Sequence, residues 1–203
     1  MFKYNTRFNN YNYTVYVPTN DAVRDAIDRG LPTWQSIAEF LELDKPEEER
    51  TELTPEGESA RNFKALAMVT TLVNFVKYHF QDRSVFVDNP AVRPTTFETA
   101  TLNSNTGVYC KVDVEAEEGS GKLTITDATN MKRNVTENVN YLTRDFTISN
   151  KVIAASSFAV IHGIDGVLNY KLYGDSAENP RYDVEWATES AAKKYLAKYR
   201  IIK

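Results

Sequence analysis

The sequence predicts an α+β domain in which mainly antiparallel strands pack with helices around one long, buried central helix. Three observations lead to this prediction. Residues 59–80 carry apolar side chains at helical spacing, residues 107–126 alternate polar and apolar side chains around a glycine-rich turn, and β-branched segments occur at 13–17 and 158–170. Separate helical and alternating stretches in one chain are typical of this class. With 203 residues, the chain is long enough for one such domain with an elaboration.

The first strand is predicted at residues 13–17, where polar and apolar side chains alternate and β-branched and aromatic residues predominate. A helix is expected to follow at once. Thr19 or Asn20 can cap its free N–H groups, and the carboxylate of Asp21 favours the positive end of the helix dipole. A second short helix is expected after Pro32.

Residues 44–58 are predicted to form an exposed insertion, because they are acidic and interrupted by proline and glycine. The helix at 59–80 follows. Two adjacent apolar stripes run along it, so we expect it to be buried over most of its circumference. It ends at Tyr78 and His79. Since His79 continues an apolar stripe, we interpret it as a core histidine rather than a catalytic one.

Strands are predicted to follow the long helix, at 84–87, 95–102, 107–115 and 122–126. The third of these alternates most regularly, which indicates a half-buried antiparallel strand. We expect Cys110 to be a buried core thiol of this strand. Its inward face is predicted to carry Val108, Cys110, Val112 and Val114.

Two further short strands are expected at 158–162 and 166–170, on either side of a glycine-bounded turn. His162 lies within the first of them, among apolar residues, and is interpreted as a core side chain. Asp165 lies in the turn, where an aspartate commonly accepts backbone N–H groups.

Residues 171–203 are predicted to be a C-terminal extension packed on the same domain. Residues 188–200 fit an amphipathic helix with a basic wet side. Its apolar side would consist of Ala192, Tyr195, Leu196 and Tyr199.

Composition excludes several classes of function. A net charge of −4 and a pI near 5.3 argue against a nucleic-acid-binding module. Cys110 is the single cysteine, so the chain has no disulfide framework and no cysteine-based metal site. No apolar run approaches the roughly 20 residues that cross a bilayer. Because the motifs of hydrolases, nucleotide-binding proteins and zinc enzymes are all missing, no catalytic residue, cofactor or metal is expected.

Three segments carry a resemblance to a known family: residues 13–23, the pair Tyr78-His79, and residues 158–168 with the sequence FAVIHGIDGVL. In this order they are similar to the first conserved block, the Tyr-His block and the second conserved block of fasciclin-type (FAS1) domains. The resemblance covers about residues 13–170. It implies the FAS1 β-wedge, with the two end blocks side by side in the core. The structural motif residues that it implies are Thr19, Asn20, Asp21, His162 and Asp165.

The resemblance assigns residues 1–170 to one FAS1 domain with an insertion at 44–58. Members of the family usually begin with two short helices before the first block, whereas here only residues 1–12 precede it. The chain is therefore expected to be a fragment of a longer surface protein. The helix at 188–200 would then cover the face that those helices normally cover.

The resemblance implies a non-catalytic, extracellular adhesion or matrix-interaction module, with a cell-surface or matrix protein or a glycan as its partner. The lack of cysteine pairs looks more like a bacterial envelope lipoprotein, attached to the outer membrane by a lipid anchor of a longer precursor. In some animal relatives the Tyr-His motif is implicated in integrin adhesion, which makes Tyr78 and His79 a candidate adhesion motif. Alternatively, a partner would meet the insertion or the face near Tyr4, Tyr11 and Tyr13.

Two other functions fit the residues. The first is a carbohydrate-binding or small-ligand-binding component of a bacterial surface nutrient-uptake system. A deep pocket lined by tyrosine or by Trp34, with converging polar groups, would favour it. The second is an unrecognised hydrolase that uses His79 or His162.

Overall fold

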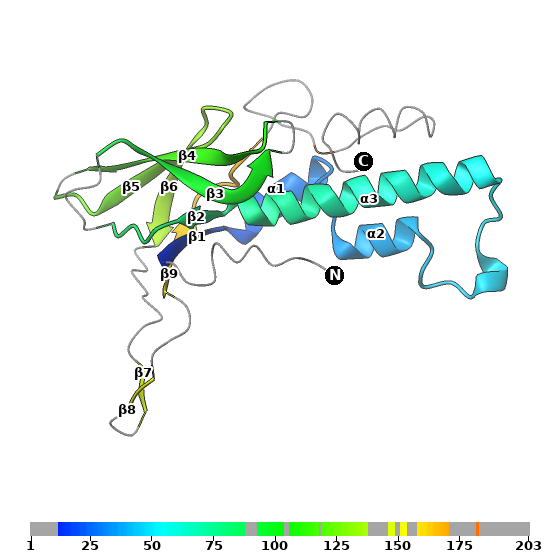
Figure 1. Cartoon of the computed structure of the whole chain (residues 1–203), viewed down its shortest axis with the longest axis horizontal. Coiled ribbons are helices and arrows are strands. Elements are labelled where there is room, and N and C mark those ends of the chain that lie inside the picture. The colour runs from blue at the N-terminus through cyan, green and yellow to red at the C-terminus, as the bar shows by residue number, and fades with distance from the viewer. Residues whose placement is uncertain are drawn as a thin grey trace.

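The computed structural model describes residues 12–87, 93–103, 106–117, 119–137, 146–148, 151–153, 158–170 and 182. Within these residues, seven strands form a closed barrel in the order β1-β2-β3-β4-β5-β6-β9. Three α-helices lie beside it (Figure 1). The barrel strands are β1 (Asn12–Pro18), β2 (Phe80–Asp82), β3 (Thr95–Asn103), β4 (Val108–Glu117), β5 (Lys122–Thr126), β6 (Lys132–Glu137) and β9 (Phe158–Ile164).

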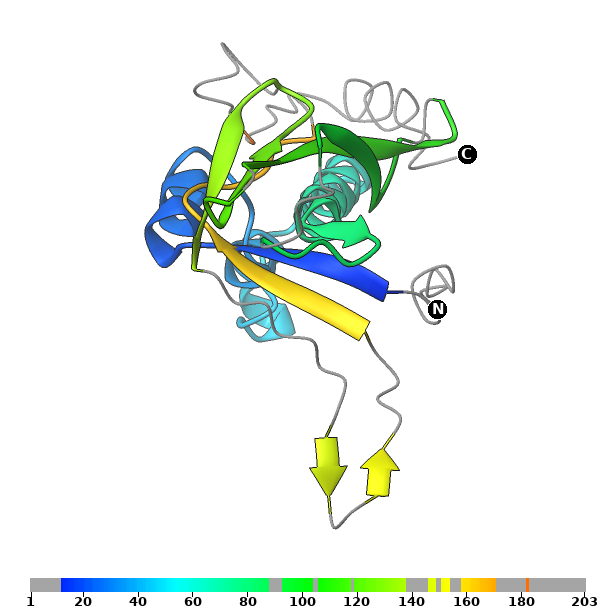
Figure 2. The ribbon, with the colours of Figure 1, turned by 90° about the vertical axis from the view of Figure 1, so that its left-hand side faces the viewer.

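This architecture corrects the predicted fold class, since the strands close into a barrel and do not form the FAS1 wedge. The barrel closes because β1 pairs with β2 on one edge and runs parallel to β9 on the other, from Asn12 opposite Phe158 to Pro18 opposite Ile164. Figure 2 shows β1 and β9 side by side. The two end blocks are thus neighbours, as expected. The prediction failed on closure because alternation reveals the two faces of a strand but not the partners at its edges.

A separate two-stranded sheet is formed by β7 (Phe146–Ile148) and β8 (Lys151–Ile153), which pair antiparallel. The predictions for residues 171–181 and 183–203, which include the helix at 188–200, lie outside the described residues. The same holds for Tyr4 and Tyr11.

The hairpin of β4 and β5 follows the predicted alternation. Val112 and Val114 are buried, and Leu123 and Ile125 continue the same inward face. Two residues of β4 differ from the prediction. Val108 is 50% exposed, because it lies at the end of its strand beside a turn, and Cys110 is only half-buried at the edge of the core.

The predicted strands at 84–87 and 166–170 are absent, because side chains bind the backbone groups that a neighbouring strand would bind. The Val85 N–H donates to Oγ1 of Thr14 at 2.9 Å, and Nε2 of His162 donates to the Val85 carbonyl at 2.7 Å. The Leu168 N–H likewise donates to Nε2 of His79 at 3.0 Å. Both segments therefore run through the core as irregular chain.

The helices are α1 (Asn20–Asp28), α2 (Trp34–Phe40) and α3 (Pro55–Tyr78), with a short 3₁₀ helix, η2 (Glu47–Glu49), between the last two. Thr19 caps α1 by accepting the Ala22 N–H at 3.3 Å, which confirms one of the two predicted caps. Helix α3 begins four residues earlier than predicted. Thr54 caps it by accepting the Gly57 N–H, and proline is favourable at the first helical position.

Helix α3 is not the buried central helix that the sequence predicted. It has 24 residues, about 36 Å at 1.5 Å per residue, and Figure 1 shows that it runs out past the barrel beside α2. Only its C-terminal part meets β2 and β3. Leu66 is 38% exposed, and Val76, near the C-terminal end of the helix, is 48% exposed. The apolar stripes reflect contacts with different partners along the helix rather than burial on all sides.

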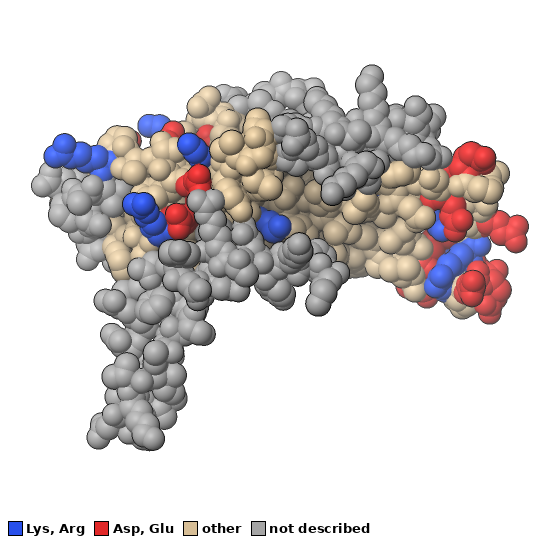
Figure 3. Space-filling view, viewed as in Figure 1, with Lys and Arg blue, Asp and Glu red and all other residues tan. Residues whose placement is uncertain are grey.

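The predicted insertion is confirmed as exposed. Its acidic residues gather at the end of the helical part away from the barrel (Figure 3). Glu42, just before it, fastens this loop: its carboxylate accepts hydrogen bonds from Nζ of Lys45 and from the N–H of Thr51, both at 2.7 Å.

Candidate functional site

His79 ends α3 and uses both nitrogens of its ring. Nδ1 donates to the Phe75 carbonyl at 2.8 Å, and Nε2 accepts the N–H of Leu168 at 3.0 Å. These partners require the neutral ring with its proton on Nδ1. Burial lowers the pKa of His79 to about 4, since desolvation disfavours the charged form. His79 is therefore a structural bridge between α3 and the segment after β9.

Tyr78 is also committed to the core. Its hydroxyl donates to the Lys111 carbonyl at 2.7 Å and accepts the N–H of Ala128 at 2.9 Å. Tyr78 is 0% exposed and His79 is 4% exposed, so the folded domain does not present the candidate adhesion motif on its surface.

His162 lies inside the barrel next to Tyr16, with ring centroids 6.3 Å apart. Nε2 donates to the Val85 carbonyl, and Nδ1 has no hydrogen-bond partner among the described residues. Burial lowers its pKa, which keeps the ring neutral. The interpretation of both histidines as core residues agrees with these positions.

Thr19, Asp21 and Asp165, from the two end blocks, line one polar cleft of about 460 Å³ between α1 and the barrel. Their polar groups already serve the fold. The Asp165 carboxylate accepts the backbone N–H and the side-chain amide of Asn134, both at 2.9 Å, and Asp21 pairs with Arg24 at 2.8 Å. Asn20 is the first residue of α1 and is exposed. Thr19 and Asp165 thus cap α1 and hold the turn after β9, whereas Asn20 makes no interaction of this kind among the described residues.

Sequence reasoning missed a buried polar hub at Asp127. One oxygen accepts the N–H and the hydroxyl of Thr129, at 2.8 and 2.6 Å, and also the N–H of Met131. The other accepts the N–H of Asn169 at 2.9 Å, and Asn169 in turn accepts the hydroxyl of Tyr182. The signal that was available is an aspartate followed by threonine two residues on, which is typical of a side-chain-stabilised turn.

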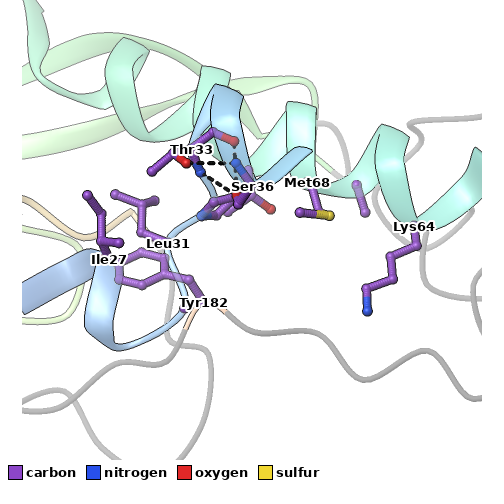
Figure 4. A pocket seen from close by; sticks show the side chains of 11 residues that line it. Ile27, Leu31, Thr33, Ser36, Lys64, Met68 and Tyr182 are labelled. Atoms are coloured by element: carbon purple, nitrogen blue, oxygen red, sulfur yellow. Dashed lines mark hydrogen bonds between the residues drawn. The ribbon is translucent and has the colours of Figure 1, made fainter. Parts of the chain in front are cut away.

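An open apolar groove of about 300 Å³ lies between the α1–α2 connection and α3 (Figure 4). We call it the helical groove. Leu31 and Ala67, 4% and 2% exposed, provide apolar surface from both sides. The residues of the helical groove used below are Ile27, Leu31, Thr33, Ser36, Lys64, Ala67, Met68 and Tyr182.

Tyr182 lines the helical groove and contacts other parts of the chain. Its N–H donates to the Arg29 carbonyl at 3.0 Å, its hydroxyl donates to Asn169, and its ring meets Phe75 edge-on at 6.2 Å. Burial raises the pKa of Tyr182 to about 12, so the phenol is neutral at physiological pH. One tyrosine therefore lines this open groove, whereas Trp34 does not.

Two hydroxyl groups of the helical groove, those of Thr33 and Ser36, belong to the cap of α2. Ser36 Oγ accepts the Thr33 N–H at 2.9 Å and donates to the Thr33 carbonyl at 3.0 Å, while Thr33 Oγ1 accepts the Ser36 N–H at 3.0 Å. Figure 4 shows these bonds at the wall of the groove. The Ser36 hydroxyl therefore already donates its hydrogen bond within the protein.

Lys64 is the charged residue of the groove. Its ammonium lies 4.8 Å from the centroid of the Phe40 ring and makes no ion pair with any described residue. Lys64 interrupts the apolar pattern of residues 59–80, which indicates a solvent-facing position on the long helix. The sequence could not locate the groove, because the groove depends on how the α1–α2 connection lies against that helix.

No known family model matches this chain, and no curated protein matches it either. Over the described ranges, no group of three or more His, Cys, Asp or Glu side chains is placed to hold a metal ion. None of the described helices has the length and hydrophobicity of a membrane-spanning segment.

Proposed function

We propose that this chain is a non-catalytic binding module that acts in adhesion or matrix interaction at a cell surface, as the resemblance to FAS1 domains implies. The observation that carries the proposal is Trp34, which is 63% exposed. Tryptophan is strongly enriched among the residues that contribute most to protein interfaces. A large aromatic ring left in solvent is available to a partner.

The position of Trp34 supports this role. It is the first residue of α2, and the reciprocal hydrogen bonds of Thr33 and Ser36 fix the backbone on which it stands. A ring on a fixed backbone loses little entropy when it binds. Leu43, 58% exposed and just beyond α2, adds apolar surface to the same part of the chain.

The test measures binding of the immobilised chain to a panel of purified matrix proteins and to a glycan array. Trp34→Ala is expected to weaken the binding of at least one partner tenfold or more, corresponding to about 1.4 kcal/mol or above. Leu102→Ala is the matched control, since Leu102 is 47% exposed but lies on the barrel strand β3. The control is expected to bind like the unmodified chain.

Two outcomes contradict the proposal. If no matrix protein and no glycan binds, the adhesion function is wrong. If a partner binds Trp34→Ala and the unmodified chain equally well, the role of α2 is wrong. The surface location is tested separately, by labelling intact cells of the native host with an antibody raised against the purified chain.

The helical groove supports a second candidate function, the binding of a small ligand. Its volume of about 300 Å³ is at the lower end of the range of ligand sites. Its apolar sides with one charged group match the usual composition of such sites.

A further inference from the structure

We propose that the helical groove binds a monoanionic amphiphile, a medium-chain carboxylate, with its apolar chain against Leu31, Ala67 and Met68 and its carboxylate at Lys64. This inference rests on the second candidate function and names the class of ligand. Three features of the groove support it. Its sides are apolar, Lys64 makes no ion pair with any described residue, and the hydroxyls of Ser36 and Tyr182 already donate within the protein.

The sides of the groove favour an aliphatic chain. Leu31 and Ala67 face it from α1–α2 and from α3, with Ile27, 40% exposed, and Met68 completing the apolar surface. Methionine adapts its shape to flexible apolar ligands. Removing an aliphatic chain from water against these side chains is favourable by about 25 cal/mol for each Å² buried.

Lys64 favours a single negative charge at one place in the groove. Among the described residues of the groove it alone is charged, and no described carboxylate pairs with it. Its contact with the Phe40 ring at 4.8 Å orients the ammonium without neutralising it. In Figure 4 Lys64 lies at one end of the group of labelled residues, and Ile27, Leu31 and Tyr182 lie toward the other. One lysine provides a point charge that suits a carboxylate, whereas no arginine offers the paired donors that favour a phosphate.

Two other polar groups of the groove disfavour a sugar, which would need several free donors and acceptors, because both already donate within the protein. Ser36 donates to Thr33, and the Tyr182 hydroxyl donates to Asn169. Trp34, whose ring could stack on a sugar, lies outside the groove. The part of the ligand that is recognised is therefore its apolar chain and its charge.

The test is calorimetric titration of the whole chain with octanoate, octanol and octylamine, which share a chain and differ in charge. Octanoate is expected to bind about three- to fivefold more tightly than octanol, the ratio for a partly exposed ion pair. Octylamine is expected to bind weakest. Lys64→Gln should abolish the preference for octanoate over octanol and leave the binding of octanol unchanged.

Two variants complete the design. Lys77→Gln is the matched control, since Lys77 is an exposed lysine of the same helix that does not line the groove, and it should keep the preference. Met68→Trp should fill the groove and abolish the binding of all three probes, while circular dichroism shows the same helix content.

The results separate the ligand class from the function. If octanol binds as tightly as octanoate, or if the preference for octanoate survives Lys64→Gln, the ligand is not a carboxylate recognised by Lys64. The groove would then still be a small-ligand site. If none of the probes binds the unmodified chain, or all bind Met68→Trp unchanged, both the ligand and the site are wrong.

Discussion

The N–H of Leu168 donates a hydrogen bond to Nε2 of His79 across 3.0 Å, joining residues that lie 89 positions apart in the chain. Through this bond the end of α3 holds the segment that follows β9. The same ring donates to Phe75, so both of its polar atoms are satisfied only while it is neutral. The packing of two of the three motif segments therefore depends on the protonation state of one buried side chain.

Stability is expected to fall in mild acid because of this histidine. The unfolded chain binds a proton on His79 near pH 6.5, whereas the folded chain binds it only near pH 4. The contribution is fully present above pH 6.5 and is lost as the pH falls toward 4. It amounts to about 3 kcal/mol. Urea denaturation between pH 7.5 and 4.5 measures it.

The control for this prediction is His79→Gln, which removes the ionisable group. This variant should be less stable at pH 7.5 but should lose less stability on acidification. The lowered pKa of His162 acts in the same direction. Part of the dependence of the unfolding free energy on pH should therefore persist in His79→Gln. An equal slope in both proteins would show that His79 does not carry the effect.

Gly166→Ala is expected to destabilise the domain by about 1–2 kcal/mol. An added Cβ would lie 2.5 Å from Nε and 2.6 Å from Cδ of Arg133. The arginine would have to move and lose its hydrogen bond to the Val167 carbonyl, now 2.9 Å long. Thermal unfolding of both single variants and of Gly166→Ala combined with Arg133→Ala forms a double-mutant cycle. Additive effects would argue against the clash.

Asp127→Asn is expected to cost about 2–3 kcal/mol of unfolding free energy, because an amide cannot accept at both positions where the buried carboxylate does. Urea denaturation is the measurement. Asp113→Asn is the matched control. Asp113 is exposed and accepts the hydroxyl of Thr96, so its loss should change stability by less than about 0.5 kcal/mol. If the two variants lost similar amounts of unfolding free energy, the hydrogen bonds of Asp127 would not have the stabilising role proposed for them.

Glu42→Gln is expected to loosen the insertion without unfolding the domain. The hydrogen bond from Lys45, followed by that from the Thr51 N–H, lowers the pKa of Glu42 to about 2. The loop should therefore stay fastened until the pH falls well below 4. Hydrogen exchange of the Thr51 amide should accelerate in the variant. Glu48→Gln, an exposed change in the same loop, should leave that rate unaltered.

Local pattern predicted the parts of the fold that depend on one segment at a time. The cap at Thr19, the inward face of Val112 and Val114, and the exposed insertion all follow from periodicity, capping chemistry or composition. The core positions of His79 and His162 followed from their apolar neighbours in the sequence. None of these requires knowledge of which segments meet.

The candidate sites needed that knowledge. The sequence offered Trp34 only as a possible lining of a pocket, and nothing in it showed that Trp34 is exposed on the domain or that Lys64 lines a groove. Asp127 likewise became a hub only through Asn169 and Tyr182, which follow it at a distance of 42 and 55 residues.

The sequence by itself determined which faces of its strands and helices avoid water, because that preference is fixed by side chains at a spacing of two or of three to four residues. Tertiary structure decided the closure of the barrel by β1 and β9, the irregular course of residues 84–87, and the groove beside α3. Those features come from contacts between residues far apart in the chain, such as Asn12 with Phe158 in the barrel and Val85 with Thr14 and His162. Only the packed chain brings such pairs together.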